Sequence, residues 1–152
     1  MGQYYYIVNL TKKQYLHPHH FNDGLKLLEF GDSAGGTMLG LAVLLANSNG
    51  RGGGDLQSEN PIVGSWAGDR IVIAGDYAEK GDKGETQKDN LYHRSAETFE
   101  DISYKVIEAL CDDSYIRNDF AIKVKGTGGW SLMSDSLPKK LRDKIGEPKP
   151  ND

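Results

Sequence analysis

The sequence predicts a single α+β domain that combines a mixed or antiparallel sheet with two main helices, at about residues 33–47 and 98–111. Short runs of aromatic and β-branched residues recur between turn signals, which is typical of strands. Two longer segments, residues 31–50 and 95–113, carry cap residues or apolar residues at helical spacing. A length of 152 residues suits one domain with a substantial core.

Five segments are predicted to be extended. Residues 3–10 (QYYYIVNL) form the first strand, and residues 14–21 form a second piece that Pro18 confines to a sheet edge or a loop. Residues 25–30 (LKLLEF) follow a strong turn signal and read as a third strand. A hairpin is expected from residues 62–66 and 70–77, and residues 120–125 (FAIKVK) form a last strand.

The first predicted helix, within residues 31–50, is almost wholly apolar, with candidate N-caps at Asp32, Ser33 and Thr37 and an end at Asn49. The second has apolar residues at helical spacing, namely Phe99, Ile102, Val106 and Leu110. The domain is expected to span residues 1–125. Glycine, proline and charge dominate residues 126–152, which are predicted to form a loosely ordered tail.

Composition narrows the classes of function. A net charge of −4 argues against a duplex nucleic-acid binder, which would carry a basic face. The single cysteine, Cys111, excludes an internal disulfide and suits a reducing cytoplasm. The longest apolar stretch, residues 38–46, is far shorter than the roughly 20 residues that span a bilayer. We therefore expect a cytoplasmic protein with no membrane partner, and we predict no cofactor.

The glycine-rich segment NSNGRGGGDL, residues 47–56, is the strongest candidate for a binding loop. Consecutive glycines allow φ of either sign, so successive N–H groups can converge on an anion. Arg51 adds a forked donor for phosphate or carboxylate. The loop is neither a Walker motif nor a dinucleotide fingerprint. Because it follows a predicted helix, a flexible connector and a ligand cradle remain equal alternatives.

Two later segments add side chains that could line a pocket with this loop. GSWAGDR supplies Trp66 for stacking on a base, and AGDY supplies a Gly-Asp turn with a tyrosine. The predicted ligand-binding residues are Arg51, Gly52, Gly53, Gly54, Asp55, Ser65, Trp66, Arg70, Asp76 and Tyr77. The function predicted from them is non-catalytic binding of a small phosphorylated ligand such as a nucleotide.

Two other classes of function stay open. The aromatic run Tyr4–Tyr6 could form a sheet edge that pairs with a partner or a second copy, which would make the chain an interaction or inhibitor protein acting as a homo-oligomer. Alternatively, Gly31-Asp32-Ser33 before a helix is the layout of GDS-type serine hydrolases, although no histidine lies in their late Asp-x-x-His motif. The competing interpretation is that Asp32 or Ser33 caps the helix.

The cluster HPHH, residues 17–20, could bind a metal together with Asp23, since imidazole is a favoured ligand. Three histidines within four residues of a loop do not easily face one ion, and no second cluster supplies the missing ligand. A solvated loop is the preferred interpretation, so no metal site is predicted.

The chain resembles a family of uncharacterised bacterial and bacteriophage proteins in six segments, MGQYYYIVNL, HPH, GLKLLEFG, NGRGGGDL, VGSWAGDRIVIAGDYA and EDISYKVIEAL. The resemblance covers roughly residues 1–117. It implies a prokaryotic or viral cytoplasmic setting and carries over no activity, cofactor or catalytic residue. In a phage, one expected role for a small nucleotide binder is to sequester a host signalling nucleotide.

Overall fold

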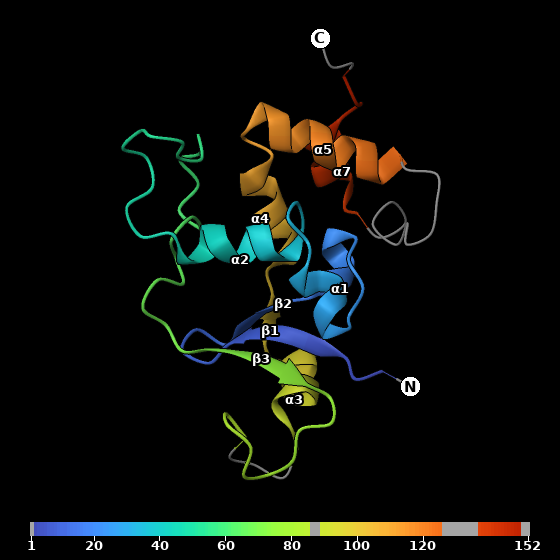
Figure 1. The fold of residues 1–152 in the computed structure, drawn as a ribbon. Helices are drawn as coiled ribbons and strands as arrows, with labels where there is room; N and C mark the ends of the chain where they lie inside the picture. The colour runs from blue at the N-terminus through green and yellow to red at the C-terminus, as the bar shows by residue number, and fades with distance from the viewer. Residues whose placement is uncertain (1, 86–88, 126–136, 150–152) are drawn as a thin grey trace.

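The computed structural model describes residues 2–85, 89–125 and 137–149, which form a single α+β domain (Figure 1). Its mixed four-stranded sheet has the order β3-β1-β2-β4. Strands β1 (Tyr5–Asn9) and β2 (Gln14–Leu16) form an antiparallel hairpin, and β3 (Ile71–Gly75) pairs antiparallel with the other side of β1. The short strand β4 (Glu100–Asp101) runs parallel to β2. The predicted fold class is confirmed.

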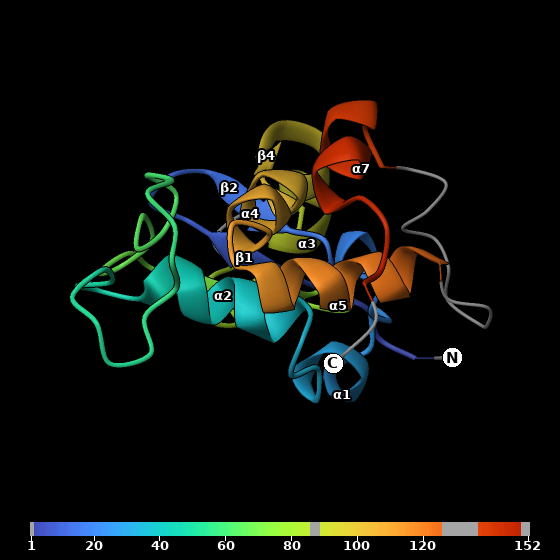
Figure 2. The same cartoon turned by 90° about the horizontal axis from the view of Figure 1, so that it is seen from above.

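Six α-helices and one 3-10 helix lie within the described residues. Their bounds are Pro18–Phe21 for η1, Leu27–Gly31 for α1, Thr37–Leu45 for α2, Leu91–Thr98 for α3, Ser103–Leu110 for α4, Ser114–Lys125 for α5 and Lys139–Ile145 for α7. Helix α3 lies on one side of the sheet, and the remaining helices lie on the other (Figure 1). Seen from above, α7 lies next to α4 and α5 and packs against both (Figure 2).

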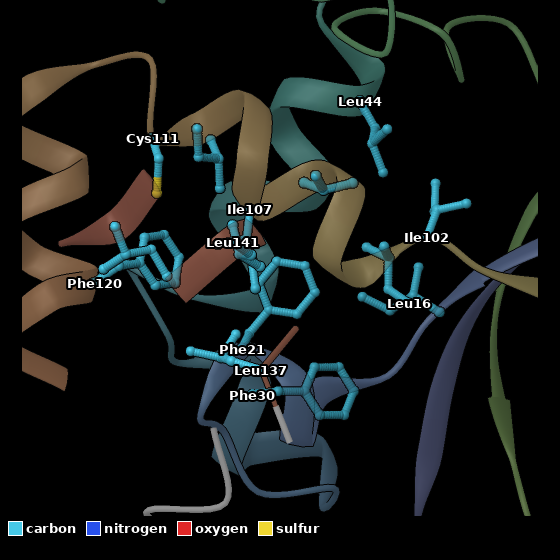
Figure 3. Packing of buried hydrophobic residues seen from close by; sticks show 14 of the residues in the cluster. Leu16, Phe21, Phe30, Leu44, Ile102, Ile107, Cys111, Phe120, Leu137 and Leu141 are labelled. Carbon is cyan, nitrogen blue, oxygen red and sulfur yellow. The ribbon is translucent and has the colours of Figure 1, made fainter. Parts of the chain in front are cut away.

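The two faces of β1 are buried in two separate clusters, because successive side chains of a strand point to opposite faces. Ile7 belongs to the larger cluster, beneath α2, α4 and α5, whereas Tyr6 and Val8 belong to the smaller one beneath α3. The Tyr6 ring stacks on Tyr92 of α3 with centroids 4.1 Å apart. Figure 3 shows the larger cluster, in which Phe21 and Phe30 lie beside side chains from α4, α5 and α7. The two clusters therefore hold the sheet between α3 on one face and the other helices on the opposite face.

The predicted edge at Tyr4–Tyr6 is wrong, because β1 lies inside the sheet between β3 and β2. The predicted strand at residues 25–30 is also wrong. Its last residues form α1, where the Glu29 side chain accepts the Lys26 N–H at 3.0 Å and the Glu29 N–H donates to the Lys26 carbonyl at 2.9 Å. The pattern of a short apolar run is compatible with a strand or a helix, and here the hydrogen bonds at the helix start favour the helix.

The predicted hairpin of residues 62–66 and 70–77 does not form, because residues 61–68 are successive turns that lead into β3. The second predicted extended piece is only partly extended, since β2 ends at Leu16 and η1 follows it. Residues 120–125 are the last half of α5 rather than a strand.

The second main helix, predicted at residues 98–111, is divided. Helix α3 ends at Thr98, β4 follows, and α4 begins at Ser103. The break occurs because the Glu100 N–H donates to the Lys13 carbonyl at 3.1 Å and the Ile102 N–H to the Tyr15 carbonyl at 3.1 Å. Sheet pairing therefore outweighs a helical pattern at this point. The first main helix is α2, which lies inside the predicted residues 33–47.

The predicted loose tail, residues 126–152, is wrong for its described part. Residues 137–149 contain α7, and Leu137, Leu141 and Ile145 are buried in the larger cluster. Residues 126–136 and 150–152 lie outside the described residues. Across the described part of the chain, none of the helices has the length and apolar character needed to cross a bilayer.

Candidate functional site

The backbone N–H groups of the glycine loop, residues 47–56, already bind a carboxylate from the same loop. Oδ2 of Asp55 accepts the N–H groups of Gly50 at 2.6 Å, of Gly52 at 2.9 Å and of Arg51 between them. Asn49 closes the base of the loop through two bonds of 2.9 Å with the Leu56 backbone. Successive N–H groups do converge here, as in an anion-binding nest. The acceptor they converge on is the chain's own carboxylate, and a ligand would have to displace it.

Trp66 is not available for stacking on a ligand. Its side chain is fully buried in the larger cluster, and its Nε1–H donates to Oε1 of Gln14 at 2.8 Å. Its backbone N–H donates to the Leu44 carbonyl at 2.9 Å. Trp66 therefore anchors the turns of residues 61–68 to α2 and β2, and the predicted stacking role is corrected to a structural one.

Arg70, Asp76 and Tyr77 flank β3 and do not form one site. Arg70 is exposed before the strand, and Tyr77 is exposed after it. Asp76 accepts the Tyr4 N–H through Oδ1 at 2.9 Å. Since a strand rises about 3.3 Å per residue, roughly 20 Å of backbone separates Arg70 from Asp76. The glycine loop follows the C-terminal end of α2, away from the end of β3 (Figure 1).

Ser65 is the one residue of the predicted set that lines a cleft formed between the β1–β2 hairpin, α4 and the turn segment at residues 60–65. The cleft has a volume of 490 Å³, compared with 380 Å³ for the cleft beside the glycine loop. We call it the Lys12–Lys105 cleft. Its lining residues are Lys12, Gln14, Asn60, Pro61, Ile62, Ser65, Ile102, Lys105 and Glu108. Sequence reasoning missed it because the residues come from three distant segments.

Three elements build the Lys12–Lys105 cleft. Lys12 lies in the turn between β1 and β2, and Gln14 begins β2. Lys105 and Glu108 are three residues apart on α4 and therefore share one face of that helix. The third wall is the turn segment at residues 60–65, in which the Asn60 side chain accepts the Ile62 N–H at 3.0 Å. Ile62 and Ile102 give the cleft an apolar part.

Each lysine of the cleft has a carboxylate partner nearby. Nζ of Lys12 lies 2.6 Å from Oδ2 of Asp69, and Nζ of Lys105 lies 2.8 Å from Oε2 of Glu100. Hydrogen bonds from Asn9 and Lys12 hold the pKa of Asp69 below its ordinary value. A hydrogen bond from Lys105 likewise lowers the pKa of Glu100. Each lysine is therefore held at the cleft by an ion pair.

The Ser65 hydroxyl is a buried polar group in need of a partner. Its Oγ is inaccessible to solvent and has no hydrogen bond to any described residue. A buried hydroxyl without a partner costs about 1–3 kcal/mol of stability.

Ser33, the candidate nucleophile of a GDS-type hydrolase, contacts a carboxylate. Its Oγ–H donates to Oδ2 of Asp23 at 2.9 Å, and the same oxygen accepts the N–H and the hydroxyl of Thr37 at 2.8 and 2.6 Å. The arrangement is that of a cap on α2, with Asp23 rather than Asp32 or Ser33 supplying the main acceptor.

The HPHH cluster is packed into the fold instead of forming a solvated loop. The His20 ring stacks between His17 and Tyr104, with centroids 4.5 and 4.6 Å away, and its Nδ1 lies 2.8 Å from Oδ2 of Asp101. Burial, together with the neighbouring His20, lowers the pKa of His17 to about 4. Within residues 2–85, 89–125 and 137–149, no three histidine, cysteine, aspartate or glutamate side chains are placed to hold a metal ion.

Comparison with known proteins adds no relative to this description. No protein-family model, curated protein or solved structure matches the chain. The resemblance to bacterial and bacteriophage proteins therefore stays a prediction, and the function has to be argued from the geometry alone.

Proposed function

We propose that this protein binds a small anionic ligand with an apolar or aromatic part in the Lys12–Lys105 cleft, without acting on it chemically. Phosphorylated nucleosides belong to this ligand class. The observation that carries the proposal is a cleft of 490 Å³ that presents two lysines beside an apolar wall. Its volume falls within the range of about 300–1,000 Å³ that is usual for small-molecule sites.

The lining residues of the cleft suit a ligand that has an anionic part and an apolar part. Lys12 and Lys105 suit a phosphate or carboxylate, which can share their charge with Asp69 and Glu100. Pro61 and Ile62 suit the flat face of a ring. A bare phosphate would use only the first half of the cleft, so we expect it to bind more weakly than a nucleotide.

The glycine loop is not part of this site. Asp55 occupies the point where its N–H groups converge, so a phosphate would have to displace a carboxylate that three N–H groups already stabilise. The loop's role in the proposal is to lead the chain from α2 into the turns that form the wall of the cleft.

A cytoplasmic setting, in a bacterium or in a cell infected by a phage, accords with the proposal. Burial raises the pKa of the Cys111 thiol to about 12, so this single cysteine stays protonated and inert. In a phage, a non-catalytic binder of this kind would act by sequestering a signalling nucleotide.

The test is calorimetric titration with mono-, di- and cyclic nucleotides and with inorganic phosphate. Lys105→Ala should weaken binding by about 10- to 100-fold, because a charge-assisted bond contributes about 1.5–3 kcal/mol. Lys139→Ala, at an exposed lysine of α7 outside the cleft, is the matched control and should bind as wild type does.

Ser65→Ala separates a binding role from a purely structural one. The variant should raise the melting temperature of the free protein, because it removes a buried hydroxyl that lacks a partner. Nucleotide binding should change little, because Oγ of Ser65 is closed off from the cleft. If no nucleotide binds the wild type, or if Lys105→Ala and Lys139→Ala bind equally well, the proposal is wrong.

A further inference from the structure

The outer edge of β3 is open, and its sequence lacks the features that usually protect an edge. β3 is the end strand of the sheet, and within the described chain no strand pairs with its outer side. Its five residues, IVIAG, include no charged residue and no proline. Ile73, at the centre, is 41% exposed. Natural edges that stay unpaired are generally blunted by lysine, proline or a bulge.

The pairing with β1 determines which backbone groups of β3 face outward. The Leu10 N–H donates to the Arg70 carbonyl at 2.9 Å, and the Asp76 N–H donates to the Tyr4 carbonyl at 2.9 Å. Hydrogen-bonded and non-hydrogen-bonded pairs alternate in an antiparallel ladder. Residues 70, 72, 74 and 76 therefore bond to β1, whereas Ile71, Ile73 and Gly75 direct their N–H and carbonyl groups away from it.

We propose that β3 pairs antiparallel with β3 of a second copy of this chain, around a twofold axis at Ile73. This register places Ile73 opposite Ile73 of the other copy and Ile71 opposite Gly75. All three outward-facing residues then form hydrogen-bonded pairs, and the two sheets join into one. The proposal concerns a surface outside the Lys12–Lys105 cleft and stands or falls independently of the ligand.

Charge complementarity selects both the occupant and the register. Position 70 of one copy comes opposite position 76 of the other, so the exposed Arg70 faces Asp76 twice in the dimer. Asp76 uses only Oδ1 for the Tyr4 N–H, which leaves Oδ2 for the guanidinium. Sliding the strands by two residues opposes Arg70 to Ala74, or Val72 to Asp76, and removes both charge pairs. It also leaves one outward-facing residue unpaired.

The sheet face next to this edge is open. A cleft of 370 Å³ lies over Tyr5, Ile73 and Gly75 and is bordered by the segment that follows β3. Figure 1 shows β3 at the front of the sheet. The Gly75 carbonyl already accepts the Ala78 N–H at 3.2 Å, so the bonds that Ile73 exchanges with its copy at the axis are the strongest of the set.

Sedimentation velocity over a range of concentrations tests the proposal. The wild type should rise from 16.7 kDa toward twice that mass as concentration increases. Ile73→Pro should remain monomeric with an unchanged far-ultraviolet spectrum, because the lost N–H faces outward and proline is tolerated there on edge strands. Val72→Pro is the matched control and should unfold or destabilise the monomer, because its N–H bonds to β1. A wild type that remains monomeric at every concentration overturns the proposal, as does an Ile73→Pro variant that still dimerises.

Charge reversal tests the register. Arg70→Glu should raise the dimer dissociation constant about tenfold or more, because it opposes like charges at both ends of the pair. The double variant Arg70→Glu with Asp76→Lys should recover most of the loss. Under oxidation, Ile73→Cys should form a disulfide-linked dimer, since directly paired strand residues are within disulfide reach. Thr98→Cys, at an exposed position on α3, should not. Equal cross-linking of the two cysteine variants, or no rescue by the double variant, overturns this register.

Discussion

Two regions of the molecule each place three hydrogen-bond donors around one carboxylate oxygen, but the two arrangements stabilise different parts of the fold. In the η1–α2 junction, residues 17–37, Oδ2 of Asp23 accepts three hydrogen bonds from Ser33 and Thr37. In the glycine loop, residues 47–56, Oδ2 of Asp55 accepts three N–H groups from Gly50 to Gly52. The donors of Asp23 are 10 and 14 residues away, whereas those of Asp55 are three to five residues away. Asp23 therefore joins two helices, and Asp55 shapes only its own loop.

The surroundings of the two carboxylates differ as much as their donors do. Thr37 is fully buried, and Phe21 and Phe30 of the larger cluster lie in the same junction. A Cβ added at Gly52, Gly53 or Gly54 would meet no atom within 4 Å. Bonds shielded from water contribute more to stability than bonds that compete with it. We therefore expect the junction to carry stability and the loop to carry little of it, and four predictions test this difference.

The largest effect is expected from Asp23→Ala. Removing the carboxylate leaves the buried Thr37 N–H and hydroxyl without an acceptor, so the free energy of unfolding should fall by about 3 kcal/mol. Asp55→Ala, the matched change in the loop, should cost about 1 kcal/mol or less, because water can solvate the freed N–H groups. Urea unfolding of both variants measures the contrast, and equal losses would contradict it.

Acid should weaken the junction through His17. Its pKa is about 4 in the fold and 6.5 in the unfolded chain, so the unfolded state takes up a proton first as pH falls. Stability is therefore complete above pH 6.5 and declines between pH 6.5 and 4, by up to about 3.4 kcal/mol at 1.36 kcal/mol per unit. The lowered pKa of His19 acts in the same direction.

His17→Asn isolates this contribution. An amide oxygen at position 17 can still accept the His19 N–H that Nδ1 of His17 accepts at 3.3 Å, but it does not titrate. The decline in melting temperature between pH 6.5 and 4 should become shallower in this variant. An unchanged slope would assign the acid sensitivity to other groups.

Substituting alanine for one glycine in each region compares the space that the two regions leave for an added methyl group. A Cβ at Gly36 would lie 2.4 Å from Oδ2 of Asp23 and 2.4 Å from Oγ of Ser33, so Gly36→Ala should cost about 2 kcal/mol by displacing them. Gly53 has a φ of +72° in open space, so Gly53→Ala should cost only about 1 kcal/mol, from the left-handed conformation. Thermal denaturation of the pair checks the order, and a larger loss at Gly53 would reverse it.

The smallest effect is expected from Arg51→Ala. Arg51 is exposed, and its backbone N–H contributes to the Asp55 contact whatever side chain it carries. The change in stability should stay within about 0.5 kcal/mol. Nucleotide binding should also be unchanged, because the proposed cleft does not include the loop. A loss of nucleotide affinity would restore the loop as the binding site and count against the Lys12–Lys105 cleft.

The sequence predicts features that depend on neighbouring residues and misses those that depend on distant ones. The strand at residues 3–10 and the convergence of N–H groups in the glycine loop follow from local patterns. The split of the helix predicted at 98–111 requires pairing with β2, which no local pattern contains. The N-cap of α2 is misassigned for the same reason, because Asp23 comes from outside the helix.

The candidate site illustrates the limit of local reasoning more sharply. Trp66 and Ser65 are adjacent in a segment with the composition of a pocket lining, yet Trp66 is buried in the core and Ser65 lines the cleft. Only the packing of the turn segment against α2 and β2 separates them. Lys12 and Lys105 are 93 positions apart and become neighbours of one cleft because β4 draws the start of α4 to the hairpin.

Because helix α7 lies late in the sequence, it affects when the core can close during protein synthesis. Leu137, Leu141 and Ile145 complete a cluster whose other members begin at Ile7, so the core stays open along α4 and α5 until residue 145 has left the ribosome. Until then the growing chain exposes Phe120 and its neighbours to whatever chaperones meet it. A stop codon or a proteolytic cut shortly after residue 125 would hold the protein permanently in that unfinished state.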